Sequence, residues 1–324
     1  MSKYVCNANQ LFEVRQYTMT DGRAAGTRAV SIWNGGDLSV TVLPDRCLDI
    51  ADVRYKGRSM AFITPSGIVN PKYFEHDGPN WLRSFGGGFL TTCGLENIGS
   101  AEEENGLTMH GRIANIPCEN LAVELGEDGL SARIAGTARE SMLFGVNLHL
   151  RRQFHFSYGD NSISFTDTIT NRGFEKVPVC VLYHMNLGYP LVDENAKIVI
   201  PSAQVTPRTD ISRENLDRWN RMEPPTAGFE EHCFYHRLNE NTYGVDNEKI
   251  NTSVRIHFES DGLLDRIVEW KMCGLGEYVL GLEAASSTID GRKGRRENGS
   301  EKYIGPGQSY VNSFRITFED LNRE

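Results

Sequence analysis

Apolar and polar residues alternate along much of the chain, and the clearest case spans residues 147–170. The run NLHLRRQFHF places an aromatic or aliphatic side chain at every second position, and SISFTDTIT resumes the pattern after a Tyr-Gly-Asp-Asn turn. Strict alternation of this kind is typical of a strand with one buried face, and a short turn between two such runs indicates a hairpin. The pattern therefore predicts a β-hairpin here.

Similar short runs recur from end to end, most of them bounded by Gly, Asn, Asp or Pro. They are TRAVSIW, LSVTVLP, LDIADVRY, NLAVELG, SARIAGTA, VPVCVLYHM, AKIVIP, SVRIHF, RIVEWKM, YVLGLEA and SYVNSFRITF. The pattern predicts about a dozen strands. The best helical pattern covers only Ser212–Met222, with Ser212 at the capping position. Many strands at short intervals indicate an all-β protein, a large sandwich of several sheets.

The length of 324 residues exceeds the usual size of one domain. All-β sandwiches nevertheless often form large single units, so length alone does not require two domains. No linker, internal repeat or low-complexity tract divides the chain. We therefore expect residues 1–324 to form a single domain.

Composition and charge narrow the class of protein. Hydrophobic residues make up 39% of the chain, enough for a sizeable core, and the net charge of -9 without any Lys/Arg block argues against nucleic acid as a partner. No apolar stretch has the length of a signal peptide core or a membrane span. The seven cysteines are scattered without C-x-x-C spacing, which favours reduced thiols. We expect a cytoplasmic protein without a membrane partner; nothing in the sequence indicates its oligomeric state.

Polar side chains are concentrated in four otherwise apolar or glycine-rich segments, as expected for a ligand cleft on a β scaffold. The segments are WLRSFGGGFLTTCGLENIG, LTMHGRIANIP, LYHMNLGYP and LGLEAASS. His184 follows a predicted strand and should lie at or near its end. Glu283 interrupts an apolar run, and burying its carboxylate unpaired would cost several kcal/mol, so it needs a partner or a chemical task. A structural role remains the alternative for each.

Histidine and glutamate also gather at Glu231, His232 and His236, and His110 lies in a Met-His-Gly-Arg segment. Such a cluster could bind a metal ion, but neither H-E-x-x-H nor H-x-H spacing is present. A serine hydrolase would need a G-x-S-x-G turn, which the chain also lacks. We therefore predict neither a metal nor another cofactor.

The order of these segments resembles that of the aldose 1-epimerase (galactose mutarotase) superfamily, in a divergent, bacterial epimerase-like branch. The matching positions are Arg83, His110-Gly111, His184 with Asn186-Leu187, Glu231 before Phe234, Glu283 in Gly281-Leu282-Glu283, and Pro306-Gly307-Gln308 before the last strand. Only Met185 separates His184 from the Asn-Leu pair, where the family usually has more residues. Glu231 stands where the family usually has Asp.

The resemblance implies a β-supersandwich and an enzyme that interconverts the anomers of an aldose. It implies Glu283 as general base, ionised near neutral pH, and His184 as general acid, protonated. The residues implied to bind the sugar are Arg83, His110, Arg112, Asn186 and Glu231. One group would remove the proton of the anomeric hydroxyl while the other protonates the ring oxygen, which requires no cofactor or metal.

The substrate and the reaction type stay open at this point. The basic segment Gly291–Arg296 could bind a phosphate, carboxylate or sulfonate of an acidic sugar, or could be a solvated hairpin tip. The same residues could serve another sugar enzyme, such as a lyase, isomerase or hydrolase. A non-catalytic carbohydrate-binding protein is the third alternative, because a fold does not determine a function.

Overall fold

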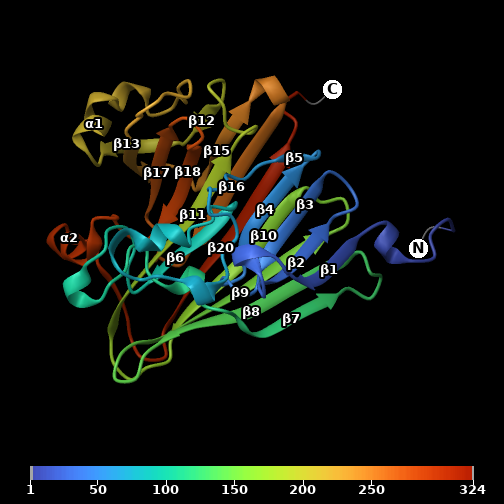
Figure 1. Ribbon diagram of the computed structural model, residues 1–324, viewed down its shortest axis with the longest axis horizontal. Helices are drawn as coiled ribbons and strands as arrows, with labels where there is room; N and C mark the ends of the chain where they lie inside the picture. The colour runs from blue at the N-terminus through green and yellow to red at the C-terminus, as the bar shows by residue number, and fades with distance from the viewer. Residues whose placement is uncertain (1–2, 323–324) are drawn as a thin grey trace.

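Three antiparallel sheets form the framework of the computed structural model, which describes residues 3–322 (Figure 1). The five-stranded sheet contains β1 (Glu13–Thr18), β2 (Arg28–Trp33), β3 (Leu38–Leu43), β4 (Asp49–Tyr55) and β5 (Arg58–Ser59). The eight-stranded sheet has the order β12 (Lys197–Val199), β15 (Thr242–Asn247), β16 (Thr252–Ser260), β20 (Ser309–Glu319), β10 (Ser162–Asn171), β9 (Asn147–Ser157), β8 (Ser131–Ser141) and β7 (Glu119–Leu125). The predicted all-β sandwich is confirmed.

The third sheet carries the residues that matter most for function. Its order is β13 (Ser202–Pro207), β14 (His232–Leu238), β17 (Arg266–Cys273), β18 (Tyr278–Ala285), β11 (Val177–Gly188) and β19 (Lys302–Ile304), with β6 (Leu90–Leu95) also paired to β11. The β9–β10 hairpin predicted from alternation is present, with Phe154 opposite Phe165. Both of these rings are buried, as the period of two requires.

Helices are short and lie in the connections between strands. The two α-helices are α1 (Asp210–Glu214) and α2 (Gly291–Glu297). The 3₁₀ turns are Ala8–Gln10, Gly22–Ala24, Pro71–Tyr73, Gly78–Arg83, Glu103–Asn105, Ile113–Asn115, Leu216–Arg218 and Glu248–Ile250. The helix predicted over Ser212–Met222 is wrong in extent. Helix α1 begins two residues earlier, capped by the hydroxyl of Thr209, and its C-cap is Asn215.

The large apolar core lies between the sheets. The ring of Tyr183 on β11 is 4.5 Å from that of Phe314 on β20, so the third sheet faces the eight-stranded one. Because side chains alternate along a strand, Tyr183 and Met185 point into this core, whereas His184 points to the opposite face of β11. That opposite face is covered by the segments around Trp81 and His110, and the site described below lies there.

A buried ion network ties the first two sheets together. Arg152 on β9 donates to Asp167 on β10 and to Asp49 on β4, at 2.6 to 2.8 Å. It also donates to the hydroxyl of Thr92 on β6, at 2.8 Å. Arg152 and Asp167 have no exposed surface. Each partner therefore depends on the other for the interactions that water would supply in the unfolded chain.

Glu140 at the end of β8 supports β6. Its carboxyl accepts a 2.6 Å hydrogen bond from the backbone N–H of Leu95. Burial raises the pKa of Glu140 to about 8, and the nearby Glu96 adds to this effect. The usual value is 4.5, so the folded chain holds a proton that the unfolded chain releases between these two values. Stability therefore falls as the pH rises through this window.

Replacing Glu140 with glutamine tests this assignment. Glutamine keeps an oxygen for the Leu95 N–H but never becomes charged. We expect the free energy of unfolding of Glu140→Gln to decline less than that of the wild type as the pH rises from about 5 to about 8. Urea denaturation at a series of pH values measures this. Parallel curves for the two proteins would contradict the raised pKa.

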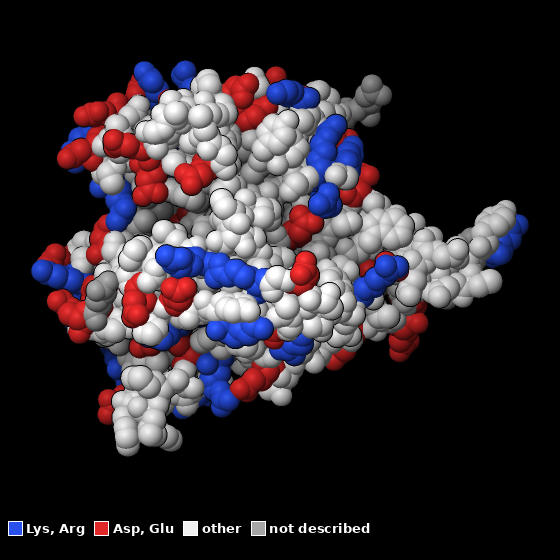
Figure 2. Space-filling view, in the orientation of Figure 1, with Lys and Arg blue, Asp and Glu red and all other residues white. Residues whose placement is uncertain are grey.

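The cysteines, the helices and the surface charges bear on the expectations drawn from composition. Cys6 is exposed and the other six cysteines are buried, and all are free thiols. Within residues 3–322 no helix is long and apolar enough to cross a bilayer. On the face shown in Figure 2, acidic and basic side chains are interspersed rather than separated into two regions.

Candidate active site

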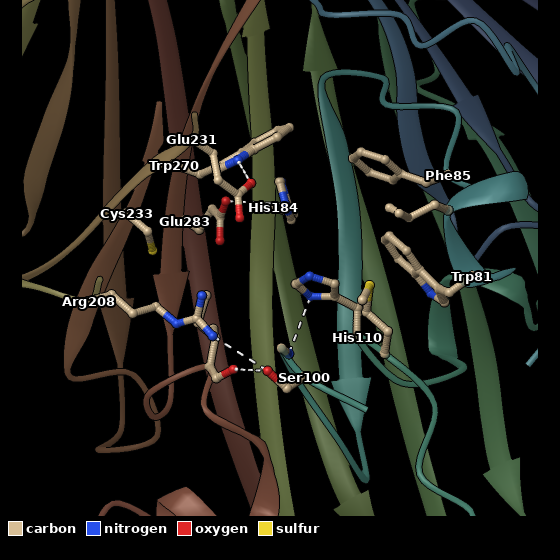
Figure 3. Close-up of a pocket in the computed structure, with 14 residues that line it drawn as sticks. Trp81, Phe85, Ser100, His110, His184, Arg208, Glu231, Cys233, Trp270 and Glu283 are labelled. Atoms are coloured by element: carbon tan, nitrogen blue, oxygen red, sulfur yellow. Dashed lines mark hydrogen bonds and ion pairs between the residues drawn. The ribbon is translucent and has the colours of Figure 1, made fainter. Parts of the chain in front are cut away.

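A cavity of about 230 Å³ lies on the face of β11 that points away from the large core. It is lined by Trp81, Leu82, Phe85, Gly99, Ser100, Met109, His110, His184, Arg208, Glu231, Cys233, Trp270, Glu283 and Ile289. In Figure 3, β11 and β18 run between one wall with Arg208 and Glu231 and another with Trp81. The cavity is smaller than the ~300–1,000 Å³ pockets that bury drug-sized ligands, so it suits a ligand of monosaccharide size.

His184 and Glu283 lie side by side in the middle of this cavity. They are directly opposite each other in the register of β11 and β18. Their atoms Nε2 and Oε1 are 3.2 Å apart, and their side chains are only 7% and 2% exposed. His184 was predicted at or near a strand end, but β11 continues to Gly188. Two neighbouring strands therefore hold the pair rigidly, which no loop end would do.

Burial governs the charge of both groups. It raises the pKa of Glu283 well above its usual value, and the negative charge of Glu231 acts in the same direction, against Arg208. Burial also lowers the pKa of His184, and His110 adds to this shift. Burial thus favours a neutral carboxyl and a neutral imidazole.

This finding differs from the expected charges, an ionised Glu283 and a protonated His184. The resemblance implied those charges, whereas desolvation by burial disfavours the charged form of each group. The two descriptions contain the same number of protons. They differ only in which of the two side chains, 3.2 Å apart, carries the proton. The pair therefore supplies one acid and one base in either form.

Glu231 and Trp270 form the upper part of the wall in Figure 3. The indole N–H of Trp270 donates to the carboxylate of Glu231 at 2.7 Å, which fixes that carboxylate at the cavity. The ring of Trp270 also lies edge-on to that of His184, 5.4 Å away. Trp81 and Phe85 stack on each other on the opposite wall, 5.0 Å apart. Aromatic walls around a polar centre are suited to the mixed polar and apolar surface of a sugar.

His110 enters the cavity from a tight turn. Its backbone is left-handed, with φ 54°, and so is that of Gly111, with φ 74°. A Cβ on Gly111 would lie 2.1 Å from the backbone oxygen of Gly94, so only glycine fits. His110 Nδ1 faces the N–H of Gly99 at 3.4 Å. Burial lowers the pKa of His110 to about 4, with Arg208 adding to the shift, so the ring is neutral at pH 7.

Arg208 is a lining residue that the sequence analysis missed. It follows β13, in a polar segment without any motif, and its signal is no stronger than that of the other arginines. Its Nε donates to Asp290 Oδ1 at 3.0 Å, and one terminal nitrogen lies 3.5 Å from the hydroxyl of Ser100. Its side chain is 24% exposed. Only the folded chain shows that this guanidinium faces Glu283 and His110.

Three residues predicted to bind the sugar do not line the cavity. Arg83 ends a 3₁₀ turn with 66% of its side chain exposed, and it donates to Asn80. Arg112 donates to the backbone oxygen of Gly106. Asn186 is fully buried and donates to backbone oxygens, including that of His184, at 3.0 Å. The structure thus places Asn186 as a support of β11, and Arg83 and Arg112 outside the site.

The structure also places the His/Glu cluster around Glu231 and the basic segment Gly291–Arg296. Glu231, just before β14, and Cys233 on β14 line the cavity. His236 points to the opposite face of the strand, where it contacts Glu269 at 2.9 Å. Within residues 3–322 no three His, Cys, Asp or Glu side chains are arranged to hold a metal ion. The basic segment is helix α2, not a hairpin tip. Its Arg295 is buried, donates to Asn97 and does not line the cavity.

Comparisons with known proteins place the chain among mutarotase-like structures. The family model described as "Domain of unknown function (DUF4432)" matches residues 24–319. A Klebsiella pneumoniae protein, described as a putative aldose 1-epimerase, is similar with a TM-score of 0.90 and 26% identity, over 97% of this chain and 87% of that one. No curated protein sequence matches.

More distant structures share the fold. A galactose mutarotase-like protein from Clostridium acetobutylicum has a TM-score of 0.69 and 13% identity, covering 97% of this chain and 100% of its own. A galactose mutarotase related enzyme from Lactobacillus acidophilus has a TM-score of 0.59 and 12% identity, covering 96% and 99%. The resemblance inferred from the order of the sequence segments is confirmed at the level of the fold.

Proposed function

This chain belongs to the DUF4432 family, and we propose that it interconverts the anomers of an aldose by acid–base opening and closure of the sugar ring. The observation that carries the proposal is the 3.2 Å contact between His184 and Glu283 inside a cavity of monosaccharide size. Similarity to the Klebsiella protein supports the same reading. An acid and a base side by side are what the reaction requires.

The reaction needs two proton movements. Ring opening takes a proton from the anomeric hydroxyl and gives one to the ring oxygen, which leaves the free aldehyde. After rotation about the bond to the aldehyde carbon, closure on the other face reverses both transfers. We assign Glu283 to the anomeric hydroxyl and His184 to the ring oxygen, once the proton has moved from Glu283 to His184 across their contact. Each residue then acts once as acid and once as base.

Other lining residues would hold the sugar during this exchange. Glu231 can accept hydrogen bonds from hydroxyls, and Arg208 and neutral His110 can donate or share them. Trp81 and Trp270 can pack against the apolar face of a pyranose ring. Holding the open aldehyde in place keeps its reacting atoms within reach of both catalytic groups. The substrate class we propose is therefore a free aldose of one sugar unit.

The dependence of kcat/KM on pH follows from the two shifted pKa values. Activity requires one proton on the pair. The acid limb, where His184 takes up a second proton, should lie well below pH 6.5. The alkaline limb, where Glu283 loses its proton, should lie well above pH 4.5. We expect kcat/KM to be constant between these limbs, because burial lowers the pKa of His184 and raises that of Glu283.

Glu231→Gln sharpens this prediction. The negative charge of Glu231 raises the pKa of Glu283, so its removal should shift the alkaline limb of kcat/KM to lower pH. The acid limb, set by His184, should move much less. An alkaline limb that stays in place would show that Glu283 does not set it.

Two further proposals concern the whole chain. Side chains from all three sheets meet in one apolar core, which supports a single domain over residues 1–324. Six buried free thiols agree with a reducing compartment, and we propose the cytoplasm.

The proposed function is tested by adding the protein to freshly dissolved single anomers of a panel of aldoses and following optical rotation. We expect faster relaxation to the anomeric equilibrium for at least one aldose, in proportion to protein concentration. Sugar binding without any acceleration would instead indicate a carbohydrate-binding protein. Formation of a new product would indicate another sugar enzyme on the same scaffold.

A further inference from the structure

Arg208 and Ser100 lie at the end of the cavity away from Glu231 (Figure 3). We propose that they form a subsite that binds two adjacent oxygens of the sugar, with Asp290 and Tyr235 as its positioning residues. The inference rests on the proposed function and concerns the part of the sugar that is remote from the anomeric carbon. The sequence resemblance had assigned the sugar-binding arginine to Arg83, which lies outside the cavity.

The guanidinium of Arg208 is held along one edge. Its Nε donates to Asp290 Oδ1 at 3.0 Å, and Asp290 does not line the cavity. In Figure 3 one terminal nitrogen points toward Glu283 and the other toward Ser100, whose hydroxyl is 3.5 Å away. This long contact leaves the terminal N–H groups available to a ligand. A planar guanidinium fixed in this way presents parallel donors to two neighbouring oxygens.

Asp290 is itself held by two elements. Its two carboxylate oxygens accept from the hydroxyl of Tyr235 on β14, at 3.0 and 3.1 Å. The same hydroxyl accepts from the backbone N–H of Ile289 at 3.3 Å. The carboxylate that orients Arg208 is thus fixed both to the third sheet and to the connection between β18 and α2. Neither Asp290 nor Tyr235 lines the cavity, so both would act through Arg208.

Two kinds of sugar oxygens match this subsite, the vicinal hydroxyls of a neutral aldose and the carboxylate of a uronic acid. The charges favour the hydroxyls. Asp290 already balances the charge of Arg208, His110 is neutral, and Glu231 adds a negative charge to the same cavity. A second carboxylate would bind against that charge. The subsite therefore selects a neutral aldose with adjacent hydroxyls remote from the anomeric carbon.

Kinetics of three variants test the subsite. Arg208→Ala should raise KM about 10- to 100-fold, because it removes hydrogen bonds from a charged group. Arg208→Lys should recover only part of this, since an ammonium cannot contact two oxygens side by side. Arg83→Ala, the matched control, should leave KM and kcat unchanged. Millimolar guanidinium ion should partly restore Arg208→Ala, which a general structural defect would not allow.

A separate experiment tests whether Asp290 and Tyr235 position Arg208. Asp290→Asn and Tyr235→Phe should raise KM less than Arg208→Ala does, with little change in kcat. Either substitution should add nothing when combined with Arg208→Ala, because residues that act through one group are not additive. Full additivity would overturn the positioning role.

A comparison of two sugars shows whether the subsite binds hydroxyl or carboxylate oxygens. A hexose and its uronic acid are compared in the wild type and in Arg208→Lys. A lower KM for the neutral hexose than for the uronic acid supports binding of two vicinal hydroxyls. A lower KM for the uronic acid, in both the wild type and Arg208→Lys, would overturn that choice. An unchanged KM in Arg208→Ala would overturn the subsite while leaving the proposed function intact. A wild type inactive on every aldose would instead remove the proposed function itself.

Discussion

Glu283→Gln is expected to lower the rate of anomer interconversion by about 10²- to 10⁴-fold, the usual contribution of one general acid–base group. Glutamine has nearly the same shape as the carboxyl form of glutamate. It can neither give up a proton to His184 nor accept one from the anomeric hydroxyl. Burial favours the uncharged carboxyl form of Glu283, so the neutral glutamine should preserve the fold. Optical rotation or anomer-exchange NMR measures the loss.

Sugar binding provides the control for this variant. Trp81 and Trp270 line the cavity, so tryptophan fluorescence should report binding of the sugar in both proteins. We expect similar affinities for the wild type and Glu283→Gln. Glu277→Gln, an exposed position just before the same strand, should retain full activity. A Glu283→Gln protein with wild-type rates would contradict the assignment of this residue.

Arg152→Met is expected to destabilise the fold by about 3 to 5 kcal/mol, the typical cost of breaking a buried ion pair. Methionine fills much of the same space but leaves Asp49 and Asp167 without their cation. Both carboxylates are buried, and Asp167 has no exposed surface. The cost arises mainly from these unpaired charges rather than from lost packing. Urea denaturation followed by circular dichroism measures the change.

The neighbouring Arg151→Met is the matched control. Arg151 lies on the same strand but is exposed, so its loss should change the free energy of unfolding by less than about 0.5 kcal/mol. Replacing Asp49 and Asp167 with asparagine in the Arg152→Met background should recover part of the stability. Equal midpoints for the Arg151 and Arg152 variants would show that the network does not stabilise the fold.

Local patterns in the sequence predict the strands well. The alternation that identified residues 147–170 reflects a real asymmetry, because one face of β9 and β10 packs into the core. Glu283 was recognised because a carboxylate in an apolar strand needs a partner. That partner is His184 on the next strand. Strand pattern and the cost of burying a charge were sufficient to single out Glu283, but only the order of the family's segments indicated His184 as its partner.

Contacts between residues distant in sequence explain why parts of the site could not be predicted. Arg208 reaches the cavity through Asp290, 82 positions away, and no local pattern records that contact. Arg83 matched a family position by order alone, yet its 3₁₀ turn directs it to solvent. The pKa shifts of His184 and Glu283 could not be predicted for a related reason. Desolvation depends on everything packed around a group, and the sequence does not show that packing.

The central claim is that His184 and Glu283 catalyse anomer interconversion, and exchange NMR tests it most directly. Saturation of the α-anomer signal of an aldose at equilibrium reports the rate at which α converts to β. We predict that, for at least one neutral aldose of a broad panel, this rate increases in proportion to wild-type protein and not with Glu283→Gln. No protein-dependent exchange for any aldose, uronic acids included, would contradict the account.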